Sequence, residues 1–529
     1  MGKHPLKVAT SKWMSIIETN SAVYGVTTNK LMEAAGKAVA DFVFQHQPKK
    51  VVVVTGSGGK AGDGYVAARH LASLGVNVSV RWVTNPELNS HEEARRNWES
   101  LKTLTTIEAG PLTGKQIAAD VIIDAMLGTG FSGKPRKEFV EAIRLVNESG
   151  AKVISIDLPS GLICDVEESL SPSVEADAVV TMHRPKPCLL KLHCDTKIAS
   201  IGIPPEAEIF AGPGDIVQNI PSRTRVSKKG DAGKVLIVAG SDEYTGAAIL
   251  CAMGAFRAGA DLVYLVSSPK TVEAARSFIP ELICFEYPHT HLDDRGVTIA
   301  SRLAEKVGAL AIGPGLGFHT GSADQTPALA TKTASLLRAA KRNSVPTVID
   351  ADAIKAIPEL PSAGKGLLSG SIVTPHAGEF EYLTNQKTPV ALGARIHGAM
   401  AVAKALDICV LLKGYCDIIA SPTAVRLSSS GVPAMAVAGT GDVLTGVTAT
   451  FVAKGVSAFS AALTAAYAVG LAGTLASIKC GEHLMARDIV DFLPQALTNP
   501  VNVSKTAGPT KLPEQVLGDV NWRELQNML

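Results

Sequence analysis

Three glycines and one acidic residue lie close together in the stretch AVAGTGDVLTG, residues 436–446, where a helix is predicted to begin. The backbone amides of Gly439, Thr440 and Gly441 at a helix N-terminus would form an anion hole for charge that builds on a transferring phosphoryl group. Asp442 would repel a phosphate donor, but its carboxylate can take the proton from an attacking hydroxyl. The pattern therefore predicts phosphoryl transfer to an alcohol. The simpler alternative is that Asp442 only caps the helix.

Three polar, glycine-containing turns each follow a strand-like run in the first half of the chain. They are GSGGKAGDG (56–64), DAMLGTGFSGK (124–134) and SIDLPSG (155–161). Because the carboxyl ends of parallel strands share one edge of a sheet, we expect the three turns to meet there. Together they predict a pocket for a phosphate-bearing ligand, although each turn alone is equally well explained as a structural connection.

The composition is typical of a large α/β enzyme. The chain has 529 residues, which is too long for one core, and 46% of them are hydrophobic while 19% are charged. The net charge of +2 and the lack of a Lys/Arg-rich tract argue against a nucleic-acid or membrane-surface partner. The start of the sequence lacks the apolar core of a signal peptide, and the uncharged segment 455–478 is rich in small residues. We therefore predict a buried helix at 455–478 and a cytoplasmic protein.

The eight cysteines form no CxxC pair and are predicted to be free thiols in a reducing compartment. His183, Cys188, His193 and Cys194 could be drawn as a metal site. Their spacing fits no common metal-binding pattern, so free side chains are the favoured interpretation.

Strand-like runs alternate with helical patterns along both halves, which predicts parallel sheets covered by helices. In the first half the expected strands are 51–55, 77–83, 120–125, 152–157 and 177–182, with helices near 29–46 and 65–74. In the second half the expected strands are 234–240, 261–266, 309–313, 346–351, 371–375 and 408–414, with a helix near 246–258. The predicted organisation is a Rossmann-like three-layer α/β domain (1–210), a linker (211–232), a second α/β domain (233–498) and a tail with a short helix (499–529).

The second half also carries an ordered series of motifs at predicted strand ends. They are GSDEYTGA (240–247), GPGLG (313–317), DADA (350–353), TPHAGEF (374–380), LLKG (411–414) and AGTGD (438–442). This series resembles the ribokinase-like superfamily and, more narrowly, the NAD(P)H-hydrate dehydratase family. The first half, through its loop at 56–64, DAMLGTG and DLPSG, is similar to the NAD(P)H-hydrate epimerase family. The tandem order resembles the bifunctional NAD(P)H-hydrate repair family of bacteria and archaea, over about residues 8–498.

The resemblance implies an enzyme that is both an isomerase and a lyase. The first domain would interconvert the R and S epimers of hydrated NADH and NADPH (NADHX and NADPHX). The second, a ribokinase-like three-layer domain, would dehydrate the S epimer with ADP as phosphoryl donor, giving AMP and phosphate. Mg²⁺ would accompany the nucleotide, and a homo-oligomer is expected. The alternatives are a vitamin or sugar kinase with an N-terminal cofactor-sensing domain, or a first domain that only binds its ligand.

The same resemblance implies roles for individual residues. Asp442 and Asp157 would be catalytic, with Asp157 at the reacting end of the substrate of the first domain. The hydrated dinucleotide would contact Ala247, Gly315, His376 and Asp442 in the second domain. The nucleotide donor would contact Lys413, Gly414, Tyr415, Cys416, Asp417, Gly439, Thr440 and Gly441. In the first domain the substrate would contact Gly59, Lys60, Ala61, Gly62 and Asp63, and its phosphate would contact Gly128, Thr129, Gly130, Phe131, Ser132, Gly133 and Lys134.

Two departures from the family pattern affect these roles. Asp124 and Ser160 match the family's potassium ligands, but Gly59 and Lys60 stand where the family has two asparagines, the second of them a potassium ligand. An ammonium carries the same charge as potassium, so we predict that Lys60 lies beside Asp124 and replaces the ion. The alternative is that Lys60 points to solvent. In the second half, Val432 stands where the family usually has an asparagine before the anion hole.

Overall fold

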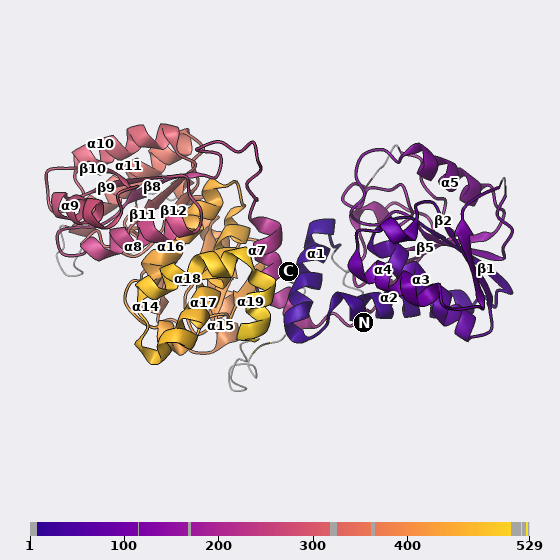
Figure 1. The fold of residues 1–529 in the computed structure, drawn as a ribbon. Coiled ribbons are helices and arrows are strands. Elements are labelled where there is room, and N and C mark those ends of the chain that lie inside the picture. Colours follow the sequence, from indigo (N-terminus) through magenta and orange to yellow (C-terminus); the bar gives the residue numbers. More distant parts are fainter. Residues whose placement is uncertain are drawn as a thin grey trace. The chain divides into compact units, whose positions relative to one another are not determined.

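The computed structural model describes residues 8–114, 116–167, 171–317, 325–360 and 366–508, with residues 520, 525, 526 and 528 near the end of the chain. The chain divides into two compact units, Met1–Pro204 and Pro205–Leu529 (Figure 1). Each contains one sheet with helices on both faces, so the predicted α/β fold class is confirmed for both halves.

The sheet of the first unit has seven parallel strands in the order β3-β2-β1-β4-β5-β6-β7. The strands are β1 (Lys50–Thr55), β2 (Asn77–Trp82), β3 (Ile107–Pro111), β4 (Val121–Ala125), β5 (Lys152–Ile156), β6 (Ala178–Met182) and β7 (Asp195–Ala199). The direction of strand addition reverses between β1 and β4. In open α/β sheets this reversal is where the loops part and a ligand binds.

The strand β1 shows how the sheet is covered on both faces. Val51 and Val53 pack in the cluster with α2, α3 and α4, whereas Val52 and Val54 pack in the cluster with α5. The helices are α1 (Ser11–Ser21), α2 (Thr28–Phe44), α3 (Gly59–Ser73), α4 (Glu92–Leu101) and α5 (Lys137–Asn147), with short 3₁₀ turns at Ala22–Tyr24, Pro86–Leu88 and Pro187–Leu189.

The sheet of the second unit has nine strands in the order β10-β9-β8-β11-β12-β13-β14-β15-β16. The strands are β8 (Lys234–Val238), β9 (Leu262–Ser267), β10 (Ile283–Glu286), β11 (Ala309–Ile312), β12 (Thr347–Ile349), β13 (Ile372–Val373), β14 (Cys409–Leu412), β15 (Asp417–Ala420) and β16 (Val425–Ser428). Strand order reverses between β8 and β11, and the last two strands run antiparallel to their neighbours.

The helices of the second unit form a layer on each face of this sheet. Val235 and Ile237 of β8 face the cluster that includes α8, α16, α17 and α18, and the alternate residues Leu236 and Val238 face the cluster that includes α10, α11 and α15. The helices are α6 (Pro205–Ile209), α7 (Pro213–Asn219), α8 (Thr245–Arg257), α9 (Pro269–Phe278), α10 (Asp294–Leu303), α11 (Gln325–Arg342), α12 (Asp352–Lys355), α14 (Ala377–Thr384), α15 (Leu392–Leu406), α16 (Thr440–Ala453), α17 (Ala458–Cys480), α18 (Ala486–Thr498) and α19 (Pro500–Ala507). Short 3₁₀ turns lie at Ala304–Lys306, Gly366–Leu368, Pro433–Met435 and Gly481–His483.

Every strand predicted from the sequence is present, and five further strands (β3, β7, β10, β15 and β16) were not predicted. Helix α3 begins at Gly59, six residues before the predicted start, because the glycine loop itself forms the first turns of the helix. Gly58 precedes it with φ of 105°, a backbone conformation that favours glycine.

The division between the units differs from the predicted linker at 211–232. Helix α7 lies inside that range, and its residues Pro213, Gly214, Asp215, Ile216 and Asn219 are buried. Ile216 packs in the same hydrophobic cluster as α17, so the start of the predicted linker is part of the second unit. In the predicted tail, α19 is a packed helix, and most of the short helix expected at the end of the chain lies outside the described residues.

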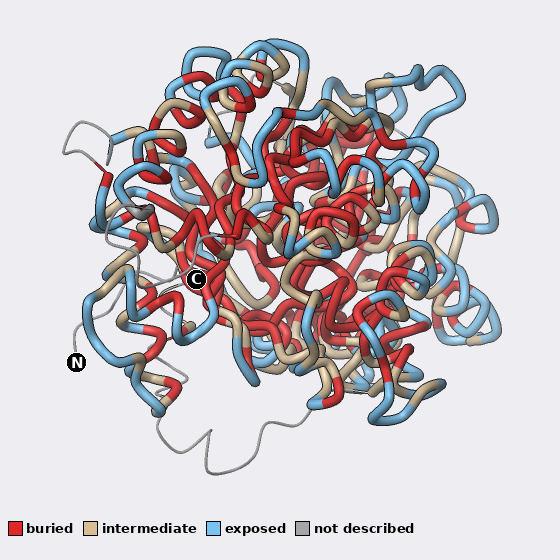
Figure 2. The backbone as a smooth tube through the Cα atoms, turned by 90° about the vertical axis from the view of Figure 1, so that its left-hand side faces the viewer, coloured by how far each residue is buried: buried red, intermediate tan, exposed pale blue. Residues whose placement is uncertain are grey.

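The uncharged segment 455–478 forms most of α17, which runs through the second unit. By length and composition the helical stretch Ala458–His483 could cross a membrane, but 83% of its most apolar window is buried inside the protein. A helix that is apolar on all sides is expected in the core of a large domain. Most residues of α17 are buried, so the predicted buried helix is confirmed. Figure 2 shows buried residues mainly in the interior of the chain trace and exposed ones mainly at its periphery.

Candidate active sites of the two units

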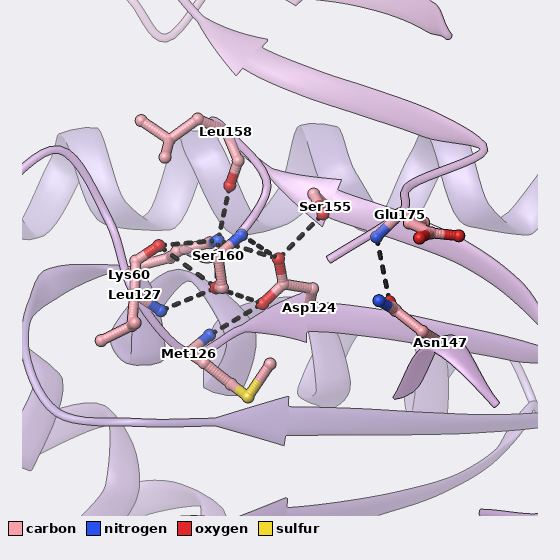
Figure 3. A network of polar contacts seen from close by, with 9 residues as sticks. All are labelled: Lys60, Asp124, Met126, Leu127, Asn147, Ser155, Leu158, Ser160 and Glu175. Atoms are coloured by element: carbon pink, nitrogen blue, oxygen red, sulfur yellow. Dashed lines mark hydrogen bonds and ion pairs between the residues drawn. The ribbon is translucent and has the colours of Figure 1, made fainter. Parts of the chain in front are cut away.

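A buried lysine lies at the strand reversal of the first unit (Figure 3). Lys60, in the first turn of α3, places its Nζ 3.2 Å from Asp124 Oδ2 and 3.1 Å from Ser160 Oγ. The same ammonium donates to the carbonyl oxygens of Leu127, at 3.0 Å, and Leu158, at 2.7 Å. Burial lowers the pKa of Lys60, and the charge of Asp124 opposes that shift. Lys60 thus points inward, as predicted, and not to solvent.

Asp124, at the end of β4, is completely buried and is saturated with hydrogen bonds. Its Oδ2 accepts from Ser155 Oγ and from Ser160 N, each at 2.8 Å, and its Oδ1 accepts from Met126 N at 3.2 Å. The hydroxyl of Ser160 donates to Oδ1 at 2.5 Å. The structure therefore brings Asp124, Ser160 and Lys60 together, and every polar atom of this carboxylate is used.

The second acid of the first unit, Asp157, follows β5 in a strained backbone conformation with φ of 63°. Its Oδ1 accepts from Met182 N at 3.0 Å and from Thr181 Oγ1 at 3.2 Å. Lys186 Nζ pairs with the same oxygen, and the Lys186 side chain is wholly buried. Partial burial, followed by the charges of Asp157 and Glu18, raises the pKa of Asp63 well above its usual range. An acid with a raised pKa near a lysine-bound carboxylate suits proton transfer.

The predicted phosphate loop, 128–134, follows β4 and is partly or fully exposed. Gly133 has φ of 78°, and a Cβ added at Gly130 would meet nothing within 4 Å, so the loop is open. Its first residue, Gly128, packs on the stem of Lys60, where an added Cβ would lie 3.2 Å from Lys60 Cβ. The loop therefore begins directly against the buried lysine side chain.

In the second unit, helix α16 begins at Thr440, and its N-cap residue Gly439 has φ of 93°. No side chain caps this helix end, so the first backbone N–H groups of the helix keep their donors for a ligand. Asp442 stands in the first turn but is not the cap, and no hydrogen bond to its carboxylate is found within the described parts of the chain. Burial and the nearby charge of Asp350 raise the pKa of Asp442 to about 7. That value suits a general base near neutral pH.

Lys413 is held between two carboxylates next to the start of α16. Its Nζ lies 2.9 Å from Asp350 Oδ1 and 3.7 Å from Glu379 Oε2. Burial alone would lower the pKa of Lys413, but the charges of Asp350 and Glu379 outweigh it and raise the pKa. A Cβ added at Gly441 would lie 3.2 Å from Lys413 Nζ, so the lysine charge is adjacent to the predicted anion hole. The two together can stabilise a transferring phosphoryl group.

Asp350 organises this cluster. It is 1% exposed and also accepts from Thr374 Oγ1 at 2.8 Å and from Thr445 Oγ1, on α16, at 2.7 Å. The neighbouring Ala351 has φ of 49°. Thus the DADA, TPHAGEF and LLKG motifs and the helix after AGTGD meet at one buried carboxylate.

Two of the predicted dinucleotide contacts, Gly315 and Ala247, lie at the strand reversal of the second unit, and His376 follows β13. Gly315 has φ of 60°, and an added Cβ would lie 2.8 Å from Ala247 Cβ and 2.8 Å from Tyr244 Cβ. Gly315 and Ala247 are therefore neighbours. His376 caps α14, where its Nδ1 accepts from Glu379 N at 3.1 Å, and most of its side chain is exposed.

The predicted donor segment 413–417 forms the turn between β14 and β15. Gly414 N donates to Asp417 Oδ1 at 2.9 Å, and burial raises the pKa of Asp417 to about 6. The Arg395 guanidinium lies 5.5 Å from the centroid of the Tyr415 ring, which is half exposed. Tyr415 thus presents a flat ring at the edge of the site, whereas Cys416 is buried.

Helices α8 and α16 approach each other backbone to backbone at two glycines. A Cβ added at Gly446 would lie 1.9 Å from the carbonyl oxygen of Cys251, and one added at Gly254 would lie 2.6 Å from that of Val443. This close approach sets the position of the first turn of α16 against that of α8.

The raised pKa of Asp442 predicts that Asp442→Asn makes the second unit more stable in alkaline solution. Between pH 3.8 and about 7 the folded state keeps a proton that the unfolded chain has lost, so the contribution of this group to stability falls as pH rises through that window. Asparagine does not ionise. We therefore expect the melting temperature of Asp442→Asn to exceed that of the wild type by more at pH 8 than at pH 5, measured by thermal denaturation of both proteins.

The matched control for this measurement is Asp491→Asn, which removes a carboxylate that is more than half exposed on α18. It should change the melting temperature little at either pH. A pH-independent difference between the wild type and Asp442→Asn would contradict the raised pKa.

Sequence reasoning missed several residues of the two sites. Lys186, which pairs with Asp157, stands in HRPKPC after a buried strand, and a lysine between two prolines was the available signal. Glu18 lies on α1, far from Asp63 and Asp157 in the sequence, and no motif around it indicated a role in the site. Asp350 lies in the DADA motif and Glu379 in the TPHAGEF motif, but neither residue was predicted to contact a ligand. The eight cysteines are free, and within the described ranges no group of three His, Cys, Asp or Glu side chains could hold a metal.

Known protein families match both units of the chain. A family described as NAD(P)H-hydrate dehydratase matches residues 235–495, and a family described as YjeF-related protein N-terminus matches residues 28–188. The bifunctional NAD(P)H-hydrate repair enzyme of Hyperthermus butylicus is 37% identical, covering 98% of this chain and 97% of its own. The enzyme of the same name from Pyrobaculum aerophilum is 38% identical, covering 92% of this chain and 97% of its own.

Among solved structures, the ADP/ATP-dependent NAD(P)H-hydrate dehydratase from Bacillus subtilis, co-crystallised with ATP and Mg²⁺, is 26% identical. It covers 55% of this chain and 98% of its own, with a TM-score of 0.45. Since the two full-length relatives extend over both units at well above 30% identity, the chain belongs to the family of bifunctional NAD(P)H-hydrate repair enzymes.

Proposed function

We propose that the chain repairs hydrated NADH and NADPH, with the first unit interconverting the R and S epimers and the second dehydrating the S epimer at the expense of ADP. The observation that carries the proposal is Asp442, a carboxylate with a pKa of about 7 in the first turn of an uncapped helix. Lys413 adjoins that turn at Gly441. A base, an anion hole and a fixed cation are the groups that phosphoryl transfer to a hydroxyl requires.

The reaction in the second unit would begin at the hydroxyl of the hydrated nicotinamide. Asp442 takes the hydroxyl proton while the oxygen forms a bond to the terminal phosphorus of ADP, and the bond from that phosphorus to the bridging oxygen breaks to release AMP. Hydroxide is a poor leaving group, but phosphate is a good one. The lone pair of the ring nitrogen then expels phosphate, and loss of a proton from the neighbouring ring carbon restores the dihydropyridine.

Different residues around Asp442 would bind the dinucleotide and the nucleotide. Gly315 and Ala247, as neighbours at the strand reversal, would contact the dinucleotide, with His376 exposed at the start of α14. Tyr415 offers a half-exposed ring for the nucleotide base, and Lys413 meets its phosphates. Phosphoryl-transfer sites hold Mg²⁺ through one or two carboxylates and the phosphates themselves. Glu379, beside Lys413, is the carboxylate that would hold it together with the phosphates, and the ion would neutralise charge on the diphosphate.

In the first unit, the open loop 128–134 would hold a substrate phosphate, and Asp157 would face the reacting ring. Asp157 is fixed by Lys186, Thr181 and Met182, and Asp63 with its raised pKa lies within reach of its charge. In epimerisation the hydroxyl would leave one ring face as water, expelled by the lone pair of the ring nitrogen, and water would add to the same carbon from the other face. The leaving oxygen gains a proton and the attacking water loses one, which suits two nearby carboxyl groups, one of which, Asp63, has a raised pKa.

The test is a product analysis with the purified full-length chain. Hydrated NADH is mixed with ADP or ATP, the return of reduced-nicotinamide absorbance is followed, and the nucleotides are separated by chromatography. We expect AMP and phosphate to form in equal amounts with NADH, and no phosphorylated dinucleotide to accumulate. Omitting the nucleotide is the control and should abolish the reaction.

Two results would contradict this proposal. Activity with ATP alone, or a stable phosphorylated product, would favour a kinase on the same fold. If only the S epimer were consumed and the R epimer persisted, the second unit would be active and the first would not be an epimerase.

A further inference from the structure

We propose that the Lys60 ammonium permanently occupies the position of a monovalent cation in the first unit, so that this unit works without potassium. The expected effect on epimerisation rests on the proposed function. The position of the ammonium does not, because it follows from the contacts of Lys60. Potassium is the ion that the family resemblance implies for Asp124 and Ser160. The residues of this chain do not fit it, because the lysine side chain already stands between them.

The first argument is the set of atoms around Nζ. One carboxylate oxygen, one hydroxyl and two backbone carbonyl oxygens lie 2.7–3.2 Å away, from Asp124, Ser160, Leu158 and Leu127. Carbonyl and carboxylate oxygens converging from separate loops are how proteins replace the hydration shell of a potassium ion. An ion placed among these four oxygens would collide with Nζ.

The second argument is charge. Asp124 is completely buried, and a buried carboxylate requires one compensating positive charge. Lys60 supplies it from inside the chain, since its side chain is only 4% exposed. A potassium ion in addition would place two positive charges on one carboxylate.

The third argument is the count of protons. Ser160 Oγ donates its only proton to Asp124 Oδ1 and accepts from Leu127 N at 2.8 Å, so toward Lys60 it can only accept. All four neighbours of Nζ are therefore acceptors. An ammonium offers three N–H donors to them, whereas a neutral amine would turn a lone pair toward an oxygen. The hydrogen-bond pattern requires the charged form.

The bonds of Lys60 also connect the two loops that the reaction would use. Leu127 immediately precedes the predicted phosphate loop, and Leu158 immediately follows Asp157. Asp157 has a strained φ of 63°, a conformation that persists only when its surroundings hold it. Lys60 is therefore a positioning residue, which fixes the Asp157 turn against the start of the phosphate loop.

The experiment asks where a heavier analogue of potassium binds. Crystals of the full-length wild type and of Lys60→Asn, which restores the family's residue, are soaked in rubidium or thallium salts, and anomalous density is measured. We expect no peak between Asp124 and Ser160 in the wild type and a peak there in Lys60→Asn. A peak at that position in the wild type, with Lys60 turned away, would overturn the proposal whatever the variant does.

Thermal denaturation provides a second readout that needs no substrate. At equal ionic strength, the melting temperature of the first unit in the wild type should be the same in potassium chloride and in sodium chloride. In Lys60→Asn it should rise by about 3–5 °C when potassium is present at about ten times its dissociation constant. Lys60→Met, which leaves Asp124 without a counter-charge, should be destabilised in both salts. A wild type that gains stability specifically from potassium would contradict the inference.

Epimerisation of hydrated NADH then tests the catalytic consequence. The wild-type rate should not respond to exchange of potassium for sodium, whereas the Lys60→Asn rate should fall about tenfold in sodium. Lys37→Asn, which removes an exposed lysine paired with Asp41 on α2, is the matched control and should behave as the wild type. If the wild type fails to epimerise in any salt, the proposed activity of the first unit fails, while the anomalous density and melting curves still decide the cation position.

Discussion

Replacing Asp442 by asparagine is expected to slow dehydration by about 10²–10⁴-fold, the usual effect of losing a general base. The side chain keeps its shape but cannot accept the hydroxyl proton. The helix N-terminus and Lys413 remain in place, so the KM for ADP should change little while kcat falls. The measurement is the steady-state rate of NADH recovery over a range of ADP concentrations.

The pH profile distinguishes this role from a structural one. Because the pKa of Asp442 is about 7, the wild-type rate should increase with pH up to that value as the carboxylate loses its proton. The residual activity of Asp442→Asn should lack that step, and Asp491→Asn should retain the wild-type profile. Near-normal turnover by Asp442→Asn would show that the base lies elsewhere.

Replacing Arg426 by methionine is expected to destabilise the second unit by about 3–5 kcal/mol, because it leaves Asp215 buried without its counter-charge. The two side chains are 4% and 1% exposed, and Arg426 Nη1 lies 2.5 Å from Asp215 Oδ1. Arg426 also donates to the carbonyl oxygens of Glu208, at 2.8 Å, and Phe210, at 2.7 Å. These contacts attach α6 and α7 to β16. Denaturant unfolding of the full-length protein measures the loss.

A double variant separates the charge from the packing. Asp215→Leu combined with Arg426→Met replaces the pair by apolar side chains and should be less destabilised than Arg426→Met alone. The transition of the first unit, which holds neither residue, is the internal reference. Equal stability of the wild type and Arg426→Met would mean that the start of the predicted linker does not depend on this pair.

The sequence predicted the central strands because their residues are buried on both faces. VVVVT and VIIDA are continuous apolar runs, which few other elements produce. Some of the missed strands lie at sheet edges, where one side is exposed. Asp195–Ala199 and Ile283–Glu286 have mostly exposed or half-exposed residues, and neither contains a long apolar run. The antiparallel strands Asp417–Ala420 and Val425–Ser428 follow a turn that was predicted to bind the nucleotide. The alternation of strands and helices along the chain predicts parallel strands only, so it gave no reason to expect this antiparallel pair.

The candidate sites could be predicted where residues close together in the sequence determine the local geometry. Glycines and an acid at the start of a helix place Asp442, whereas Lys60 was predicted to lie next to Asp124, 64 positions away, only through the family's potassium ligands. Contacts between distant segments are different, since they depend on the tertiary structure and not on local spacing. Lys186 meets Asp157 across 29 positions, and Arg426 meets Asp215 across 211. A single sequence does not reveal which residue Lys186 or Arg426 pairs with.

The crossing of α8 and α16 has a consequence for the spacing of the two ligands. Ala247, a predicted dinucleotide contact, is in the first turn of α8, and Gly441, a predicted donor contact, is in the first turn of α16. Gly446 meets the backbone of Cys251 and Gly254 meets that of Val443, so at these two points the backbones themselves set the distance between the helices. Under the proposed function, the gap that a hydroxyl must cross to reach a phosphorus atom would be set by these two backbone contacts.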